Sequence, residues 1–495
     1  MNVSEYQSTR NRNINITCTE AILQGISKEG GLFVPKALPK MDFTLENILE
    51  FDYQTLAYRV MRLFFDDFKV EDLKECINKA YDEKFDTSVI APLKTILSAH
   101  FLELFHGPTL AFKDMALSIL PYLMTTSKTY QQEDKEIVIL TATSGDTGKA
   151  ALEGFANVAG TRIIVFFPED GVSDVQKRQM TTQKGDNTFV VGIKGNFDDA
   201  QTGVKQIFAD AELEKELAQK GYVFSSANSI NIGRLVPQVV YYFYAYGQLV
   251  KEGSIKVGER MNVVVPTGNF GNILAAYYAK EMGLPIHKFI CASNKNKVLT
   301  DFFEKGIYDR RRDFHITNSP SMDILISSNL ERFLYHMSNE NAELVNELMG
   351  ALKDQGVYEI PEDMKQNMGL FAAGYADDEV TAKTIRKVYD EENYLMDTHT
   401  AVAYAVYEDY KNRTQDMTPT VIASTASPYK FTGSVMGAID NQYKAQDDFI
   451  LLKEMEKLLN EKMPSTIRDL ETMEIKHKTI CEVDEMKQVV RAFLG

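Results

Sequence analysis

The residue best placed to do chemistry is Lys113, in the stretch HGPTLAFKDMAL at residues 106–117. Its neighbours Ala111 and Phe112 prefer the interior of a protein, so we expect the lysine side chain to be buried at least in part. Burial favours the neutral form of an amine, and a neutral amine condenses with a carbonyl group to give a Schiff base. The plainer alternative is a surface lysine at the start of a helix, paired with Asp114.

A glycine turn, TGNFGN at residues 267–272, follows an apolar run and precedes a helical pattern. Gly268 and Gly271 let the backbone approach a ligand closely, and the N–H groups of the turn and of the first helical residues point at one spot. That spot suits a phosphate. The spacing is not that of a dinucleotide fingerprint. A tight connection that binds nothing is the alternative.

A second turn of this kind, SGDTG at residues 144–148, is not a nucleotide-binding P-loop. Thr143 stands where the first glycine of that motif belongs, and Ala150 replaces its magnesium-binding hydroxyl. Thr143, Ser144 and Thr147, with the amides around them, are suited to hold a substrate carboxylate at a helix N-terminus.

Apolar runs and helical patterns alternate through most of the chain. Strands are predicted at residues 137–140, 162–167, 189–193, 222–224, 262–265, 287–292 and 419–423, and long helices at 197–220, 233–250 and 397–412. Runs that are apolar throughout indicate α/β architecture, with two mainly parallel open sheets flanked by helices. Ligand sites of such sheets form beyond the carboxyl ends of the strands. We therefore expect Lys113, the two turns and a further loop, STASP at 424–428, to converge.

The patterns also suggest three domains. A small, mainly helical domain is predicted at residues 1–92, and a large domain at 93–134 and 230–495. A smaller α/β domain is predicted to be inserted at residues 135–229.

Composition excludes several function classes. The 495 residues are 44% hydrophobic and 25% charged, as in ordinary globular proteins, and the formal charge of −16 argues against a nucleic-acid surface. Neither a signal peptide nor a stretch of membrane-spanning length is recognisable. The four cysteines lack CxxC spacing, so reduced thiols and a cytoplasmic location are expected. Metal-ligand spacing is absent, so no metal is expected. The oligomeric state is not predicted.

A lysine amine, a phosphate cradle, a carboxylate cradle and a pair of hydroxyls are the set of groups that pyridoxal phosphate requires. The segments that carry them also show a family resemblance. HGPTLAFKD, TATSGDTGKAA, NSINIGR, PTGNFGNI, DTHTAVAY and STASPYKF occur in this order, after STR and GGLFVP near the N-terminus. Together they resemble the threonine synthases of bacteria and fungi over nearly the whole chain.

The resemblance implies the tryptophan synthase β-like fold, which is fold type II of pyridoxal 5'-phosphate enzymes, with a small N-terminal domain. It also implies that O-phospho-L-homoserine and water are converted to L-threonine and phosphate, the last step of threonine biosynthesis.

The resemblance further implies residue roles. Lys113 matches the family lysine that forms the Schiff base with the cofactor, and Thr425 matches a hydroxyl beside the pyridine nitrogen. Asp146 falls where related enzymes often have an asparagine near the ring hydroxyl. The cofactor phosphate is assigned to the loop of Gly268, Asn269, Phe270, Gly271 and Asn272. Ser427 and Tyr429 depart from the frequent family reading STAHPAKF, so no histidine role is carried over to that loop.

A phosphorylated substrate needs cations of its own. Arg234 is the first candidate because a guanidinium fork matches phosphate geometry, and Lys177 and Arg178 are further candidates. For the latter two, a solvated helix face is an equally good reading. His106 and His399 lie in matched motifs, but a lone histidine in a partly apolar segment is more often a buried structural residue. Both are left out of the predicted catalytic set.

Two other functions stay open. Another enzyme of the same fold, such as a serine or threonine dehydratase or a cysteine synthase, would share the lysine and the glycine turn but not GGLFVP or HGPTLAFKD. A binding protein for a phosphate ligand on a retired catalytic scaffold is the second alternative, and the retention of Lys113 speaks against it.

Overall fold

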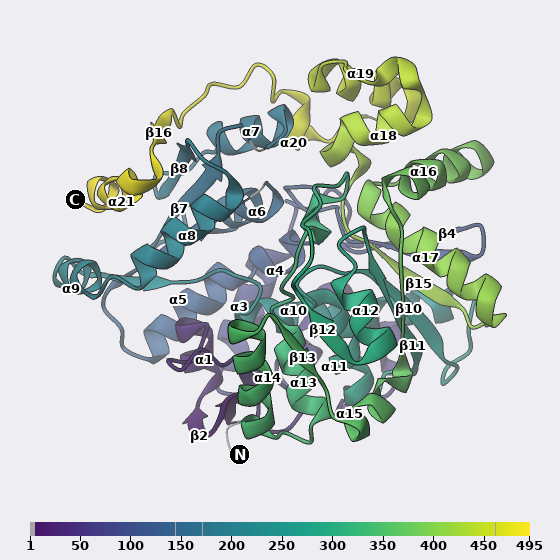
Figure 1. The fold of residues 1–495 in the computed structure, drawn as a ribbon, viewed down its shortest axis with the longest axis horizontal. Coiled ribbons are helices and arrows are strands. Elements are labelled where there is room, and N and C mark those ends of the chain that lie inside the picture. Colours follow the sequence, from purple (N-terminus) through teal and green to yellow (C-terminus); the bar gives the residue numbers. More distant parts are fainter. Residues whose placement is uncertain (1–4, 144, 171, 461) are drawn as a thin grey trace.

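Two sheets, one of six strands and one of five, organise the chain into two lobes (Figure 1). The computed structural model describes residues 5–143, 145–170, 172–460 and 462–495. The larger sheet has the order β14 (Phe371–Tyr375), β11 (Ile286–Ser293), β10 (Met261–Pro266), β15 (Thr420–Ser424), β5 (Ala99–Glu103) and β4 (Leu93–Ile96). Its strands run parallel except for the antiparallel pair of β4 and β5.

Helices cover both faces of the larger sheet, which explains why its strands are apolar throughout. Along β10, Val263 and Val265 join the core that includes α10 (Ile232–Lys251) and α11 (Gly271–Met282), whereas Val264 joins the core of α17 (Thr398–Thr414). Successive strand residues point to opposite faces, so both faces need apolar side chains. The remaining helices around this sheet are α12 (Val298–Lys305), α13 (Leu330–Met337), α14 (Ala342–Asp354), α15 (Glu362–Asn367), α16 (Asp378–Glu392), α18 (Thr432–Ile439), α19 (Asp448–Leu459) and α20 (Ser465–Arg468).

The smaller sheet is parallel throughout. Its order is β16 (Thr479–Cys481), β8 (Thr188–Ile193), β7 (Thr161–Pro168), β6 (Glu136–Ala142) and β9 (Tyr222–Ser225). Its helices are α6 (Asp146–Phe155), α7 (Asp174–Thr181), α8 (Phe197–Phe208), α9 (Ala211–Gln219) and α21 (Met486–Leu494). In Figure 1 the yellow C-terminal segment lies against this blue lobe.

The N-terminal part contains a small antiparallel sheet in the order β2 (Asn11–Ile16), β1 (Tyr6–Ser8) and β3 (Phe33–Pro35). Its helices are α1 (Cys18–Gln24), α2 (Tyr53–Met61) and α3 (Val70–Ala80), and α4 (Asp114–Leu117) and α5 (Leu120–Tyr130) follow after β5. A further two-stranded ribbon pairs β12 (Ile307–Asp309) with β13 (Val357–Glu359).

The predicted fold class is confirmed, but one predicted helix is wrong and four strands of the two sheets were missed. The single helix expected at residues 197–220 is two helices, because Asp210 caps a new one by accepting a hydrogen bond from the N–H of Leu213. The four strands that were not predicted are β14 at one edge of the larger sheet, β5 and β4 at its other edge, and β16, which pairs with β8 in the smaller sheet. The predicted domain boundaries stay predictions.

Gly154 lies where two helices pack closely, so a substitution there tests how tightly α6 is packed against α4. It lies in α6, and a Cβ atom there would meet the backbone oxygen of Leu117, in α4, at 2.1 Å. A Gly154→Ala change should therefore lower the free energy of unfolding by about 1–3 kcal/mol. Gly350→Ala in α14, where a Cβ meets nothing within 4 Å, should instead raise it by up to about 1 kcal/mol. Urea denaturation of both variants measures the difference, and an equal effect would show that α4 and α6 are loosely packed.

His106 predicts a pH dependence of stability. Burial lowers the pKa of this histidine, but hydrogen bonds with Asp86 (2.6 Å) and Glu103 (3.0 Å) outweigh it and raise the pKa to about 9. The unfolded chain releases this proton near pH 6.5. The stabilisation is therefore complete below about pH 6.5 and lost as the pH rises to about 9. His106→Asn should remove this loss, measured as the difference between wild-type and variant unfolding free energies across that window.

Candidate active site

Lys113 lies immediately before α4, beyond the carboxyl end of β15 in the larger sheet. The segment before it is fixed to the loop after β15, because the N–H of Phe112 donates to the backbone oxygen of Thr425 at 2.8 Å. Asp114 turns away from Lys113 and accepts hydrogen bonds from the N–H and hydroxyl of Thr109. Lys113 is 8% exposed, so the expected burial is observed.

Two polar groups face the Lys113 amine. Its Nζ lies 3.4 Å from the hydroxyl of Ser321 and 3.7 Å from Oδ2 of Asp146. Burial lowers the pKa of Lys113, and although Asp146 opposes this, Lys430 and Arg234 lower the pKa further. The amine is therefore biased towards the neutral form that acts as a nucleophile and base.

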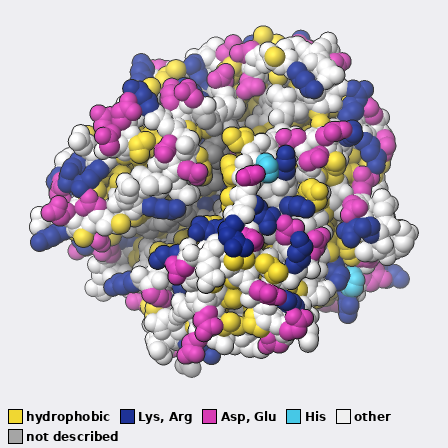
Figure 2. All heavy atoms as spheres, viewed as in Figure 1, with side chains coloured by type: hydrophobic (Ala, Val, Ile, Leu, Met, Phe, Trp, Pro, Cys, Tyr) yellow, Lys and Arg dark blue, Asp and Glu magenta, His cyan; other side chains and the backbone are white. Residues whose placement is uncertain are grey.

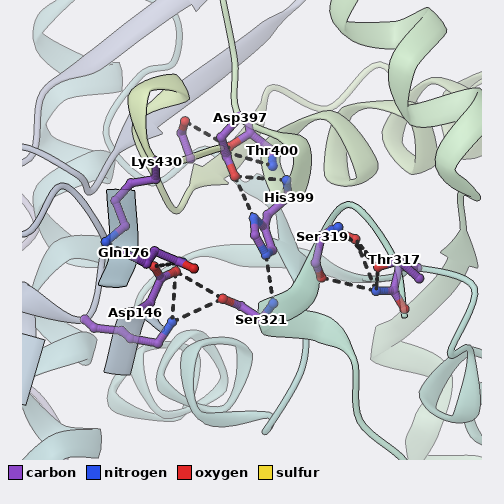
Figure 3. Close-up of polar contacts among 12 residues, drawn as sticks. Asp146, Gln176, Thr317, Ser319, Ser321, Asp397, His399, Thr400 and Lys430 are labelled. Carbon is purple, nitrogen blue, oxygen red and sulfur yellow. Dashed lines mark hydrogen bonds and ion pairs between the residues drawn. The ribbon is translucent and has the colours of Figure 1, made fainter. Parts of the chain in front are cut away.

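Asp146, the first residue of α6, joins the two lobes. Its Oδ1 accepts from Nζ of Lys430 at 3.0 Å and from the amide of Gln176 at 3.1 Å, and its Oδ2 accepts from the hydroxyl of Ser321 at 3.2 Å (Figure 3). Burial alone would raise the pKa of this carboxyl, but Lys430 and Lys113 hold it well below its usual range. Asp146 is thus an ionised carboxylate in the interior.

Ser321 is held by a histidine and a second carboxylate. The N–H of Ser321 donates to Nε2 of His399 at 3.1 Å, and Nδ1 of His399 lies 2.7 Å from Asp397 (Figure 3). Because Nε2 accepts an N–H, the ring proton lies on Nδ1 and the imidazole is neutral. His399 therefore orients the serine that contacts Lys113, rather than touching the amine itself.

The glycine turn lies beside Ser321. Gly268 allows the close approach, since a Cβ there would lie 2.6 Å from the backbone oxygen of Ser321. Phe270 has a left-handed backbone (φ 61°) and buries its ring against Phe303 and Phe333, so only its backbone faces the turn's ligand side. Asn269 is exposed. Ser327 and Asn329 brace the turn by donating to the backbone oxygens of residues 268 and 269.

Some polar groups of the turn before α6 are hydrogen-bonded to one another. The hydroxyl of Thr143 accepts hydrogen bonds from the N–H groups of Gly145 and Gly148, at 3.0 and 2.9 Å. Thr147 is partly exposed at the start of α6, and Ser144 lies outside the described residues. Gly145 has φ 141°, and a Cβ there would lie 2.6 Å from the Gln176 amide. A side chain at this position would therefore push Gln176 away from Asp146.

Arg234 is a buried cation close enough to Lys113 to affect its pKa. Its Nη1 donates to the backbone oxygen of Ala227 at 2.9 Å, and its Nε has no partner among the described residues. Burial lowers the pKa of Arg234 to about 10. Thr425 is also buried, with its backbone oxygen engaged by Phe112.

The other candidates lie elsewhere. Lys177 pairs with Glu169, and Arg178 donates to the backbone oxygens of residues 470, 471 and 473. A cavity of about 600 Å³ between α6, α7 and residues 465–473 is not lined by Lys113 or Asp146. One residue that lines this cavity, Gln179, contacts Lys430: its Oε1 accepts a hydrogen bond from Nζ of Lys430 at 3.3 Å.

Sequence reasoning missed Lys430, Ser321 and Gln176. Lys430 belongs to STASPYKF, so its motif was recognised while its charge was overlooked. Ser321 lies far from the recognised motifs in sequence, and Gln176, although it precedes the candidates Lys177 and Arg178, is an uncharged residue without a recognisable pattern.

The molecular surface gives two further findings. Figure 2 shows acidic and basic side chains interspersed over one face, which is hollowed between the lobes. In the described part of the chain, no helix is long and apolar enough to cross a membrane, and no group of three or more His, Cys, Asp or Glu residues is arranged to hold a metal.

Comparison with protein families accounts for nearly the whole chain. Residues 5–81 match the threonine synthase N terminus, residues 101–425 match the pyridoxal-phosphate dependent enzymes, and residues 400–490 match the threonine synthase C-terminal family.

Individual relatives agree with these matches. The chain is 42% identical over 435 residues to human threonine synthase-like 1, covering 85% of this chain but 58% of the length of that relative. It is 35% identical to threonine synthase of Saccharomyces cerevisiae, covering 92% of this chain and 93% of the relative. The crystal structure of threonine synthase from Brucella melitensis with bound pyridoxal phosphate superimposes with a TM-score of 0.87, at 34% identity and 99% coverage of both chains. The chain therefore belongs to the threonine synthase family of pyridoxal-phosphate-dependent enzymes.

Proposed function

We propose that this chain converts O-phospho-L-homoserine and water to L-threonine and phosphate, with pyridoxal phosphate as cofactor. The observation that carries the proposal is the position of Lys113. Its buried amine contacts Ser321, and Ser321 contacts both Asp146 and the glycine turn at residue 268. The lysine, the carboxylate and the turn thus form one site in a chain of the threonine synthase family.

The residues around Lys113 fit pyridoxal phosphate. Among the described residues, Nε of Arg234, whose charge lowers the pKa of Lys113, and Nδ2 of Asn272, in the glycine turn, are buried without a hydrogen-bond partner. Such donors are costly to bury, which supports a polar ligand as their missing partner. When bound, pyridoxal phosphate supplies an aldehyde that captures amines and a ring that stabilises negative charge on neighbouring carbon atoms.

Each predicted cofactor residue has a matching task. Lys113 would bind the aldehyde, and Thr425 would supply a hydroxyl to the pyridine nitrogen. The amides of residues 268–272, at the N-terminus of α11, would hold the phosphate. The ionised carboxylate of Asp146 would accept a hydrogen bond from the ring hydroxyl.

During the reaction, Lys113 moves protons. Once freed by the substrate amine, its Nζ would remove protons from Cα and Cβ, return one to Cγ after phosphate leaves that carbon with the bonding electrons, and return the other to Cα. Water would add its hydroxyl at Cβ and give its remaining proton to the departing phosphate, which completes threonine. A buried amine of lowered pKa suits both tasks, because it is neutral when it must accept a proton.

The substrate anions need separate partners. Arg234 is proposed for the phosphate, since its unpartnered Nε is a free guanidinium donor. The turn with Thr143, Ser144 and Thr147 is proposed for the carboxylate. The hydroxyl of Thr143 already accepts two backbone N–H groups, so its part is to shape the turn.

Lys113→Ala should abolish both cofactor capture and turnover. The wild-type chain with pyridoxal phosphate should absorb at the violet edge of the visible spectrum and release phosphate and threonine from phosphohomoserine. Lys113→Arg is the matched control, because it keeps the charge but cannot condense with an aldehyde, and it should lose the band as completely as Lys113→Ala.

The same assays separate the alternative functions. Ammonia release from serine or threonine, without phosphate release from phosphohomoserine, would indicate a dehydratase. A wild-type band without turnover of either substrate would indicate a retired scaffold, and no band at all would contradict the proposed cofactor role of Lys113.

Arg234→Leu should raise the KM for phosphohomoserine by about 10- to 100-fold, the effect of losing one charge-assisted hydrogen bond. Cofactor absorbance should stay normal. Arg234→Lys keeps a charge and should raise KM less. Arg178→Leu is the control, since that guanidinium contacts only backbone oxygens of residues 470–473 among the described partners. An unchanged KM in Arg234→Leu would remove this arginine from the substrate site.

A further inference from the structure

Lys430 is a second buried lysine that the proposed reaction leaves without a task. It lies in the 3-10 helix η4 (Pro428–Phe431), directly after β15 and its loop, and its side chain is 1% exposed. Its Nζ contacts Oδ1 of Asp146 and Oε1 of Gln179, at 3.0 and 3.3 Å. A fully buried ammonium with these contacts is a fixed charge, because it cannot reach a ligand without breaking its ion pair.

The two carboxylate oxygens of Asp146 have different partners. Oδ1 accepts from Lys430 and Gln176, whereas Oδ2 faces Ser321 and Lys113. Lys430 is also closer to the carboxylate than Lys113 is, at 3.0 Å against 3.7 Å. Asp146 therefore pairs mainly with Lys430. This ion pair compensates most of the negative charge of Asp146, so little of it stabilises a proton on Lys113.

Charge balance then distinguishes the two lysines. With Lys113 neutral, the buried Lys430–Asp146 pair carries no net charge; with Lys113 protonated, one positive charge in the interior is left over. An uncompensated buried charge is strongly unfavourable.

In the described part of the chain, the other charged groups near Lys113 do not pair with its amine. Arg234 on α10 adds a further positive charge near it, and it contributes with Lys430 to the lowered pKa of Lys113. His399 on α17 is neutral because its Nε2 accepts an N–H. Asp114, next to Lys113 on α4, directs its carboxyl oxygens to the N–H and hydroxyl of Thr109, and burial raises its pKa to about 6.

We infer that Lys430 is a positioning residue for the reaction: it occupies Asp146 as its own counter-ion, so that Lys113 is the lysine that gives up its proton. The inference rests on the proposed function of Lys113. It assigns to the STASPYKF loop an electrostatic task, rather than a contact with cofactor or substrate.

Charge-changing variants of the full chain test this inference. The pH midpoint at which Lys113 is reductively methylated by formaldehyde with cyanoborohydride as the reductant, read by mass spectrometry of its peptide, reports the proton affinity of that amine. Lys430→Gln should raise the midpoint by roughly one to two pH units, and Asp146→Asn should lower it. The double variant, which removes both charges, should return close to wild type. Lys149→Gln is the matched control, because it removes a lysine of α6 that pairs with Glu153.

The order of midpoints decides the outcome. A midpoint in Lys430→Gln that is unchanged or lowered overturns the inference, as does a double variant that shifts as far as either single change. Circular dichroism checks folding, and Lys430→Met, of similar length, replaces the Gln variant if that one is unfolded. Since methylation needs no cofactor, absence of the pyridoxal phosphate band in wild type would count against the proposed function and leave the test of Lys430 intact.

Discussion

A carboxylate shared by two buried lysines is the interaction on which the rest of the site depends. Asp146 can stay ionised in the interior only because Lys430 and Lys113 hold its pKa down against the effect of burial. The same carboxylate accepts the hydroxyl of Ser321, and through this serine the lysine is linked to the glycine turn. Removing the charge of Asp146 would leave the buried ammonium of Lys430 without its counter-ion, a more costly arrangement than the pair it replaces.

The partners of this interaction come from both lobes. Asp146 and Gln176 belong to helices of the smaller sheet, whereas Lys113 and Lys430 follow strands of the larger one. The ion pair is therefore also a tie between the lobes, since parting a buried pair costs about 3–5 kcal/mol. Gly145 also supports these contacts, because a side chain at this position would push Gln176 out of hydrogen-bonding reach of Asp146. Relative movement of the lobes is constrained to arrangements that keep these contacts.

Local patterns predicted much of the fold and little of this network. Seven strands of the two sheets were recognisable because burial on two faces makes them apolar throughout, as in Val263 to Val265, whereas β4, β5, β14 and β16 were not predicted. Residue type and local position were enough to recognise three candidate parts of the site: Lys113 as a reactive amine, the turn at residue 268 as a phosphate site and Arg234 as a phosphate-binding cation. Ser321 was not recognisable, because it is positioned by a hydrogen bond to a histidine that lies 78 positions later in the chain. Lys430 was not, since its partner lies in the other sheet. The pairing of β16 with β8 was missed for the same reason.

That pairing has a consequence for how the molecule is made. Residues 479–481 close the edge of a sheet whose other strands are complete by residue 225, and α21 then completes the core on one face. During synthesis, more than half of the chain must emerge after β8 before its open edge gains a neighbour. An unpaired edge is a site for association with other chains, so this edge of the smaller sheet is open to such association until its last strand pairs.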